Sequence, residues 1–379
     1  MRTAERITRR GGYVRPFVEA DIPQVAELHR RVFQTGEAPS AELERRYRAY
    51  FRGIFLDNPW YDEEVSPLVY EDADGSIAGF LGVMPRRMSI RGRPIQAAVS
   101  SQFIVEPGRR STMAAVHLMK TFMSGPQDVS IADEANGLSR KLWESLGGAT
   151  ALLHSIHWAR LLRPAQFGLL RMGRGTRLGT ASVVGPVCRL VDGVAAHLPR
   201  SPFRHSVTSL SSEDLDVETL LACLSESSGR PALRPEYDAR SLRWLLGCLV
   251  PARGEGSLHK ALVRDAAGQV LGWYLYYAGP AGLGEAVHIG ARHESMKAVL
   301  EHLFQDAWRR DVVALSGRLE PRFTAGFAQT YCLFHPRLCW MLVHSRDAEV
   351  LQAIHSGDAM LTRLEGEWCM RFQMESRDL

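Results

Sequence analysis

The feature that most constrains this chain of 379 residues is a long-period repeat. Three pairs of like residues, each separated by 193 positions, occupy matching places in two similar patterns: Asp21 and Asp214, Gly75 and Gly268, and Gly79 and Gly272. The aspartates stand where a short strand turns into a helix. The glycines stand in and just after a hairpin turn. Such a period indicates two copies of one structural unit.

Both copies continue in the same order after the hairpin. Residues 100–122 and 286–307 each indicate a strand, a polar loop and a helix, and a further strand follows at 128–135 and at 311–321. The second copy is expected to open with a strand at Val207. We therefore predict an α/β (α+β) fold of two tandem units, each a mixed and mostly antiparallel sheet flanked by helices. The expected division is 13–165, a connecting segment 166–205, and 206–379.

Composition excludes several classes of protein. The net charge of +4 is small for this length and predicts no nucleic-acid partner, and the four arginines among residues 1–10 are typical of a solvated tail. No apolar run reaches the ~20 residues that a membrane span needs. The six cysteines form no CxxC pair and no cluster has metal-ligand spacing, so we expect reduced cysteines, no metal and a cytoplasmic location.

Three motifs lie in order in the first copy. They are "SSQFIVEP", then "GRRSTMAAVHLMKTF", then "ANGLSRKLWESLGG", in which Asn136 is expected to cap a short helix. Together they resemble the GNAT superfamily of acetyl-CoA-dependent N-acetyltransferases, over about residues 13–165. The resemblance implies that acyl-CoA is the co-substrate and that its pyrophosphate lies at the N-terminus of the second motif's helix, where free backbone N–H groups favour an anion. The cofactor-binding residues it implies are Ile104, Val105, Arg109, Arg110, Ser111, Thr112, Met113, Ala114, Ala115, Asn136 and Trp143.

Two residues depart from the family pattern. Met113 stands where the family has its central glycine, and Trp143 stands where it often has a tyrosine that protonates the leaving thiolate. An indole N–H is a hydrogen-bond donor and not a usable acid, so we expect the thiolate to leave without that help. In the second copy, the matching loop keeps Arg292 but adds Glu294 and has no glycine. We expect that second loop not to bind coenzyme A.

Candidates for the general base are the carboxylates at strand ends: Glu106, Asp133 and Glu134. For Asp133 and Glu134, service at the N-terminus of the helix that follows is an equal alternative. His154 and His157 have the odd spacing that puts two side chains on opposite faces of a strand, so at most one of them faces a site.

The function that these features favour is transfer of an acyl group, with acetyl as one candidate, from coenzyme A to a primary amine of a small molecule or sugar. The aromatic strand "GWYLYYAG" of the second copy is a candidate wall of the acceptor pocket. Two alternatives remain open. One is an aminoacyl-tRNA-dependent transferase resembling the peptidoglycan-bridge enzymes, which the modest charge disfavours. The other is a non-catalytic, coenzyme A-binding regulatory protein.

Overall fold

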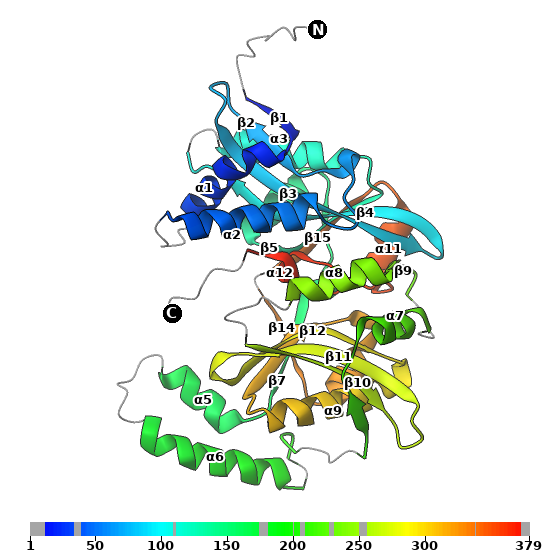
Figure 1. Ribbon diagram of the computed structural model, residues 1–379. Helices are drawn as coiled ribbons and strands as arrows, with labels where there is room; N and C mark the ends of the chain where they lie inside the picture. Colours follow the sequence, from blue (N-terminus) through cyan, green and yellow to red (C-terminus); the bar gives the residue numbers. More distant parts are fainter. Residues whose placement is uncertain are drawn as a thin grey trace.

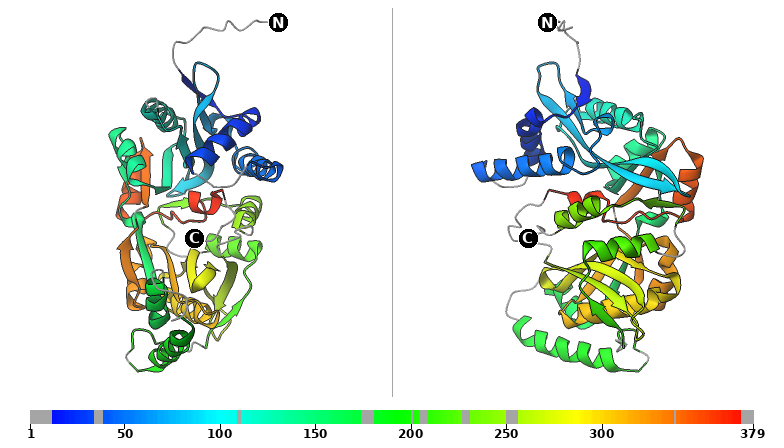
Figure 2. Two further views of the ribbon diagram at one scale, coloured as in Figure 1. Left: turned by 90° about the vertical axis from the view of Figure 1, so that its left-hand side faces the viewer. Right: turned by 45° about the vertical axis from the view of Figure 1, so that its right-hand side comes forward.

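The computed structural model describes residues 12–33, 39–108, 111–173, 181–199, 201–204, 209–226, 231–249, 256–337 and 339–372. It consists of two α/β units, one above the other in the view of Figure 1. The C-terminal helix α12 (Glu367–Met370) lies between them, and the turned views of Figure 2 agree on this position. One apolar core runs from the first unit into the second, because buried side chains of both sheets belong to the same cluster.

The first sheet has eight strands, in the order β1-β2-β3-β4-β5-β15-β6 with β9 beside β3. Of these pairings only β4 with β5 is parallel. The bounds are β1 Tyr13–Pro16, β2 Leu68–Glu71, β3 Ile77–Ile90, β4 Arg93–Val105, β5 Val129–Ala135, β6 Ala149–Thr150, β9 Leu233–Pro235 and β15 Trp340–Ser345. Helices α1 (Ile22–Val32) and α2 (Ala41–Phe51) pack with one face of the sheet. Helices α3 (Ser111–Met123) and α4 (Gly137–Ser145) pack with the other.

The second sheet has seven strands, in the order β14-β7-β13-β12-β11-β10-β8. Again only one pair, β12 with β13, is parallel. The strands are β7 Ile156–Leu161, β8 Ser211–Glu213, β10 Ser257–Arg264, β11 Val270–Ala278, β12 Leu283–Ala291, β13 Ala314–Arg318 and β14 Leu333–Pro336. The remaining helices are α5 Pro164–Gly173, α6 Ala181–His197, α7 Val217–Glu226, α8 Ala239–Leu249, α9 Met296–Arg309, α10 Thr324–Gln329 and α11 Ala348–Ser356, of which α11 packs on β15 and β9 of the first sheet.

The structure confirms the predicted fold class. In both sheets an antiparallel hairpin is followed by a parallel strand pair with a helix between its members, α3 in one and α9 in the other. The two hairpin turns also agree in detail. Gly75 and Gly268 both have positive φ, 84° and 79°, and their N–H groups donate to the carbonyl oxygens of Asp72 and Asp265. Glycine adopts this backbone conformation without a steric penalty, which explains why it recurs at this turn.

One feature of the topology modifies the expected division of the chain. Strand β7 precedes residue 165, yet it pairs with β13 and β14 in the second sheet. Strand β15 lies near the C-terminus, yet it pairs with β5 and β6 in the first sheet. The two halves therefore exchange a strand each, and neither sheet is built from one continuous stretch.

The segment between the units is more structured than its glycine content suggested. Helices α5 and α6 occupy most of it, and the intervening residues 174–180 lie outside the described part of the chain. The strand expected at Val207 also falls outside the described residues, and the first described strand of that half is β8. None of the six cysteines forms a disulfide. Among the described residues, no helix is both long and apolar enough to cross a bilayer.

Candidate active site

The candidate site is the gap where β4 and β5 part. The two strands pair in parallel only from Ala97 to Val99 and from Val129 to Ile131. Beyond this pairing both strands continue, β4 to Val105 and β5 to Ala135, with no ladder between them. Strands that diverge in this way leave backbone groups free to meet a ligand, so the gap is a natural place for an extended substrate.

An irregularity in β4 lies at this gap. The register between β3 and β4 shifts between Phe80 and Gly82, and Gln102 has a φ of 51°. This combination is a β-bulge, which turns local backbone groups away from the sheet ladder. As a result, the N–H of Gln102 donates to a side chain, Glu367 Oε1, at 2.8 Å.

Glu367 therefore stands at the gap, although it comes from the C-terminal end of the chain. Its side chain is half-buried, and burial raises the pKa of its carboxyl to about 7, while the bond from Gln102 opposes this rise. A carboxylate with a pKa near the working pH is suited to accept and release a proton.

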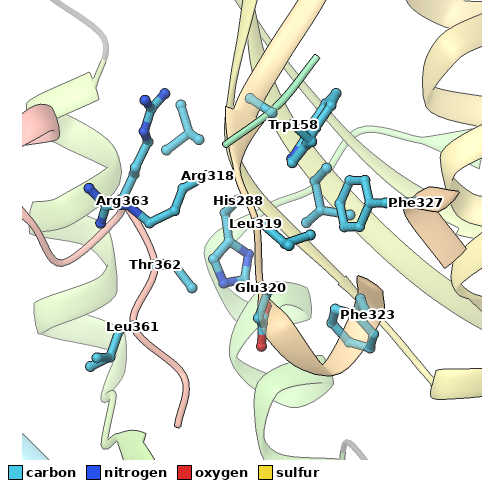
Figure 3. Close-up of a pocket in the computed structure, with 13 residues that line it drawn as sticks. Trp158, His288, Arg318, Leu319, Glu320, Phe323, Phe327, Leu361, Thr362 and Arg363 are labelled. Carbon is cyan, nitrogen blue, oxygen red and sulfur yellow. The ribbon is translucent and has the colours of Figure 1, made fainter. Parts of the chain in front are cut away.

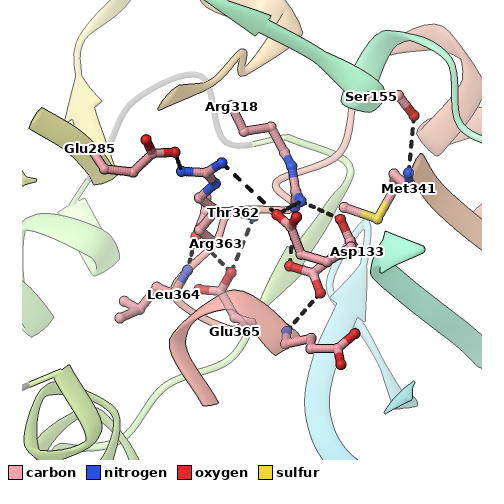
Figure 4. Close-up of polar contacts among 11 residues, drawn as sticks. Asp133, Ser155, Glu285, Arg318, Met341, Thr362, Arg363, Leu364 and Glu365 are labelled. Carbon is pink, nitrogen blue, oxygen red and sulfur yellow. Dashed lines mark hydrogen bonds and ion pairs between the residues drawn. The ribbon is translucent and has the colours of Figure 1, made fainter. Parts of the chain in front are cut away.

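The C-terminal segment, residues 359–372, is held in place by a carboxylate of β5. Asp133 Oδ1 accepts a hydrogen bond from the Glu367 N–H at 2.6 Å, and Arg318 Nη1 lies 3.3 Å from Asp133 Oδ2. Burial raises the pKa of Asp133, with Arg318 acting in the opposite direction. Figure 4 shows that these groups converge from both units and from the C-terminal segment.

A chain of ion pairs continues from Asp133 across the interface. Arg318 of β13 also pairs with Glu134 at 3.1 Å, and Arg363 of the C-terminal segment pairs with Glu285 of β12. Arg363 is 1% exposed. Burial acts to raise the pKa of Glu285, but Arg363 and Arg337 more than offset it, so this pKa is lowered. Because these pairs are buried and involve both sheets, losing one partner would leave an uncompensated charge at the interface.

An aromatic wall closes the gap on the α1 and α2 side. His29 joins Tyr47 to Gln102, with 3.0 Å from Nδ1 to the Tyr47 hydroxyl and 2.8 Å from Nε2 to Gln102 Oε1. Burial lowers the pKa of His29 to about 4, so the ring is neutral. The ring of Phe372 stacks on Tyr47 with centroids 4.2 Å apart. The last described residues of the chain thus complete this wall.

A narrow cavity lies directly under the point where β4 and β5 part. Its lining includes Val99, Ile131 and Asp133 from the two strands and Glu365 and Gly366 from the C-terminal segment. Three methionines also line the cavity: Met88, Met341 and Met360. Burial raises the pKa of Glu365 to about 8. Arg86 also lines the cavity, and burial lowers its pKa only to about 10, so the cavity is mainly apolar with a buried cation at pH 7.

Of the predicted cofactor residues that the structure describes, most lie on the opposite, α3 side of the first sheet, and Ile104 lies on the α1 and α2 side. Arg109 and Arg110 lie outside the described residues, and Ser111 and Thr112 are described only as the first residues of α3. Met113 is 59% exposed on the first turn, whereas Ala114 is buried and Ala115 half-buried. On β4, Ile104 packs into the α1 and α2 core and Val105 against the α3 core. Helix α3 begins at Ser111, six positions after the end of β4 at Val105, and packs on the face of the first sheet opposite α1 and α2.

Asn136 and Trp143 have structural partners of their own. Asn136 Oδ1 accepts from the N–H groups of Leu138 and Ser139 at 3.0 and 2.9 Å, so it caps α4 as the sequence predicted. Trp143 is 1% exposed, and its Nε1 donates to the Val343 carbonyl of the exchanged strand β15 at 3.0 Å. The contact with the cofactor that the resemblance implies for Trp143 stays a prediction.

Among the remaining predicted candidates, Glu106 directly follows the end of β4 and stays a predicted base, and the two histidines are buried. Glu106 is at the surface, paired with Arg31. His154 and His157 are both buried, with burial lowering their pKa values to about 4 and 3. They were expected on opposite faces of one strand, but His154 precedes β7 in a short 3-10 turn, Leu153–Ser155. Neither histidine is placed to serve as a base at neutral pH.

The second unit has a corresponding gap between β12 and β13, drawn in Figure 3. His288, Phe323 and Phe327 line it, and Trp158 of the exchanged strand β7 fills one side. Burial lowers the pKa of His288 to about 3. The loop before α9 holds Arg292 and a 3-10 turn, His293–Ser295. That this loop does not bind coenzyme A stays a prediction.

Sequence reasoning missed Glu367 as a site residue. The bond from Gln102 to Glu367 spans 265 positions, and "GEWCM" resembles an ordinary amphipathic turn. A raised carboxyl pKa at a buried position is the signal that identifies it, and this signal exists only in the folded chain.

The fold consists of two α/β units with mixed sheets flanked by helices. Residues 13–128 match the family model of the acetyltransferase (GNAT) domain, which confirms the resemblance seen in the sequence motifs. None of the curated proteins matches the chain. In the described part of the chain, no group of three or more His, Cys, Asp or Glu side chains is arranged to hold a metal ion.

Solved structures share the two-unit fold at low sequence identity. A probable N-acyltransferase of unknown function from Enterococcus faecalis V583 has a TM-score of 0.54 at 11% identity, covering 88% of this chain and 72% of its own. A GCN5-related N-acetyltransferase from Anabaena variabilis ATCC 29413 has a TM-score of 0.53 at 11% identity, covering 87% and 72%. Saccharomyces cerevisiae N-myristoyltransferase with bound myristoyl-CoA has a TM-score of 0.50 at 9% identity, covering 88% and 82%. At these identities the likeness concerns the fold alone.

Proposed function

We propose that this protein transfers an acyl group from an acyl-CoA to the primary amine of a small acceptor, with Glu367 as the general base. The observation that carries the proposal is the gap between β4 and β5. Helix α3 begins six positions after the end of β4 on one face of the sheet, and a carboxylate with a pKa of about 7 lies at the gap. The myristoyl-CoA bound to a protein of the same fold supports acyl-CoA as the co-substrate.

The two faces of the gap suit the two substrates. The α3 N-terminus offers backbone N–H groups to a pyrophosphate, and Arg109 and Arg110 add positive charge in the sequence before it. On the other face, Tyr47 and His29 are buried, so the half-buried Phe372 and Glu367 are the groups that an acceptor could contact. An acyl-CoA approaching from α3 and an amine approaching from this other face would meet at the bulge of β4.

We propose the methionine-lined cavity under the gap, about 20 Å³ in volume, as the place for the acyl group. The cavity is narrow and largely apolar, which favours a short acyl group such as acetyl over a long chain. Unbranched methionine side chains adapt their shape, so a modest range of acyl lengths is expected.

The proposed chemistry needs one base. The amine nitrogen attacks the thioester carbonyl carbon, a C–N bond forms, the C–S bond breaks, and coenzyme A leaves as a thiolate. Glu367 takes the proton that the amine loses. A thiol of pKa ~8.5 is an adequate leaving group near neutral pH, so no acid is required in place of the missing tyrosine. Asp133 acts as a positioning residue, because it binds the N–H of Glu367.

The experiment combines ligand-induced thermal shifts with a thiol-release assay. Acetyl-CoA, longer acyl-CoAs and desulfo-CoA are compared for stabilisation of the full chain, and amine acceptors are then screened by release of free coenzyme A. Stabilisation by acetyl-CoA and turnover with an amine are expected. Binding without turnover over a broad amine panel would favour the regulatory alternative. No stabilisation by any acyl-CoA would refute the proposal.

A further inference from the structure

The second unit holds a cavity of about 430 Å³ at the edge of its sheet, beside β7 and β14. Its lining comes from β7, from the turn after α6, from the end of α10 and from the start of β14. The apolar side chains of the lining include Leu161, Pro202, Phe203, Ala328 and Leu333. None of the lining residues belongs to the cavity under the gap between β4 and β5. A cavity of this size can hold a small organic molecule, so it is a candidate binding site of its own.

Arg160 of β7 is the charged residue of this lining. It is 4% exposed, and its guanidinium donates from Nη2 to the Pro202 carbonyl at 2.5 Å and from Nη1 to the Tyr331 carbonyl at 3.4 Å. Because Pro202 and Tyr331 both line the cavity, these two bonds hold the guanidinium at the cavity wall. Its Nε is buried and has no hydrogen-bond partner in the described part of the chain. A guanidinium has more N–H donors than these two bonds use, so donors of Arg160 remain for a ligand.

Within the described residues, Arg160 has no carboxylate partner. Its hydrogen bonds go to backbone carbonyls, and burial lowers the pKa of Arg160 with no carboxylate among the groups that oppose this effect. Residues 199–210, of which the structure describes only part, contain no aspartate or glutamate. Buried charges in proteins are normally paired, so Arg160 is a buried cation whose partner an anionic ligand would supply.

A neighbouring arginine shows the usual arrangement. Arg163 lies three positions further along the chain, its side chain is 12% exposed, and its Nη2 pairs with Asp311 at 2.9 Å. Around the guanidinium of Arg160 the structure instead places two carbonyls and the rings of Phe304 and Tyr331, whose centres lie 5.7 and 5.9 Å from its carbon. The two arginines therefore differ in the charge that faces them, although both are largely buried.

We propose that this cavity binds a small organic anion, a carboxylate carried on an apolar body. The carboxylate accepts paired hydrogen bonds from Arg160, because a planar guanidinium matches its two oxygens. The apolar body lies against Phe203 and covers Tyr331 and Leu333, which are 61% and 60% exposed in the free chain. Inorganic phosphate would pair with the cation but leave this apolar lining uncovered, and a neutral apolar molecule would leave the cation unpaired. The site does not depend on the proposed acyl transfer.

The test is isothermal titration calorimetry with the full chain. The probes are benzoate and octanoate, which are carboxylates on an aromatic and an aliphatic body, their neutral amides benzamide and octanamide, and inorganic phosphate. We expect at least one carboxylate to bind about tenfold or more tightly than its amide, as expected for a hydrogen bond to a charged group. Phosphate should bind more weakly than that carboxylate, because it buries no apolar surface.

Two variants test the cation and the cavity separately. Arg160→Met keeps an unbranched side chain and removes the charge, so the affinity for the carboxylate should fall about tenfold or more. Ala328→Phe places a larger side chain at an exposed position of the lining and should weaken binding by filling the cavity. Arg163→Met is the matched control and should bind like the unmodified chain, because Arg163 does not line the cavity. Melting temperatures check that each variant is folded.

Several outcomes would overturn the proposal. One is that neither carboxylate binds, and another is an equal affinity for the carboxylate and for its amide or phosphate. A third is undiminished binding by Arg160→Met or, if that variant does not fold, by Ala328→Phe. Equal losses in Arg160→Met and Arg163→Met would also contradict it, because the effect would then follow from net charge alone. None of these measurements uses acyl-CoA or an amine, so their failure is distinguishable from failure of the proposed function.

Discussion

Replacing Glu367 by glutamine should make the protein more stable and less active at pH 8. Burial raises the pKa of the Glu367 carboxyl from 4.5 to about 7, so ionising it in the folded chain is unfavourable. A tenfold change in an ionisation constant corresponds to about 1.4 kcal/mol, so the ionised carboxylate opposes folding by up to about 3 kcal/mol above pH 7. Glutamine has nearly the same shape and cannot ionise, and its amide oxygen can still accept from the Gln102 N–H.

The sign of the pH dependence follows from the raised pKa. The folded chain binds this proton more tightly than the unfolded chain does, so stability is lost as pH rises from about 4.5 to about 7. The Glu367→Gln variant should lack this part of the loss. Melting curves or urea unfolding between pH 4.5 and 8 should therefore show the two proteins converging at low pH and the variant gaining about 1–3 kcal/mol at pH 8, because Glu367 is only half-buried.

The Glu367→Gln substitution should lower the activity although it raises the stability. Loss of a general base lowers kcat by about 10²–10⁴-fold, and the apparent pKa of about 7 in kcat/KM should disappear with it. Affinity for acyl-CoA should be unchanged. Glu106→Gln is the matched control, since Glu106 is a carboxylate of the same sheet that is exposed and paired with Arg31. If Glu367→Gln keeps at least a tenth of the activity and the same pH profile, Glu367 is not the base.

Three further predictions concern the cofactor side and the interface. Trp143→Phe should keep most of the activity but have a lower melting temperature, because one buried hydrogen bond worth about 1–3 kcal/mol is lost. Trp143→Ala should lower the free energy of unfolding by about 3–5 kcal/mol. Single-turnover rates and unfolding curves test both variants. Arg110→Glu should weaken acyl-CoA binding while Arg292→Glu should not, and calorimetry showing equal losses or two sites per chain would contradict the single-site proposal. Arg318→Ala should destabilise the fold by about 3–5 kcal/mol, because Asp133 would stay buried without its cation. In the Asp133→Asn background, a second substitution at Arg318 should cost much less.

The local elements of this protein follow from its sequence. The turns at Gly75 and Gly268 need positive φ, and glycine supplies it whatever the surroundings. The cap at Asn136 likewise joins atoms only two or three residues apart. Because each of these features depends on neighbours along the chain, the repeat, the strand and helix order and the resemblance to the GNAT superfamily were all predictable.

The tertiary structure alone decided which sheet each strand joins and what closes the site. Residues 156–161 have the same local sequence pattern whether they pair with β5 or with β13. The exchange of β7 and β15 therefore cannot be predicted from the local pattern. Glu367 is an ordinary glutamate in the sequence, and it acquires its raised pKa only when the C-terminal segment is buried against Asp133 and Gln102. Both features depend on contacts between residues far apart in the sequence, and a carboxyl group's pKa responds to the dielectric and charge around it in space.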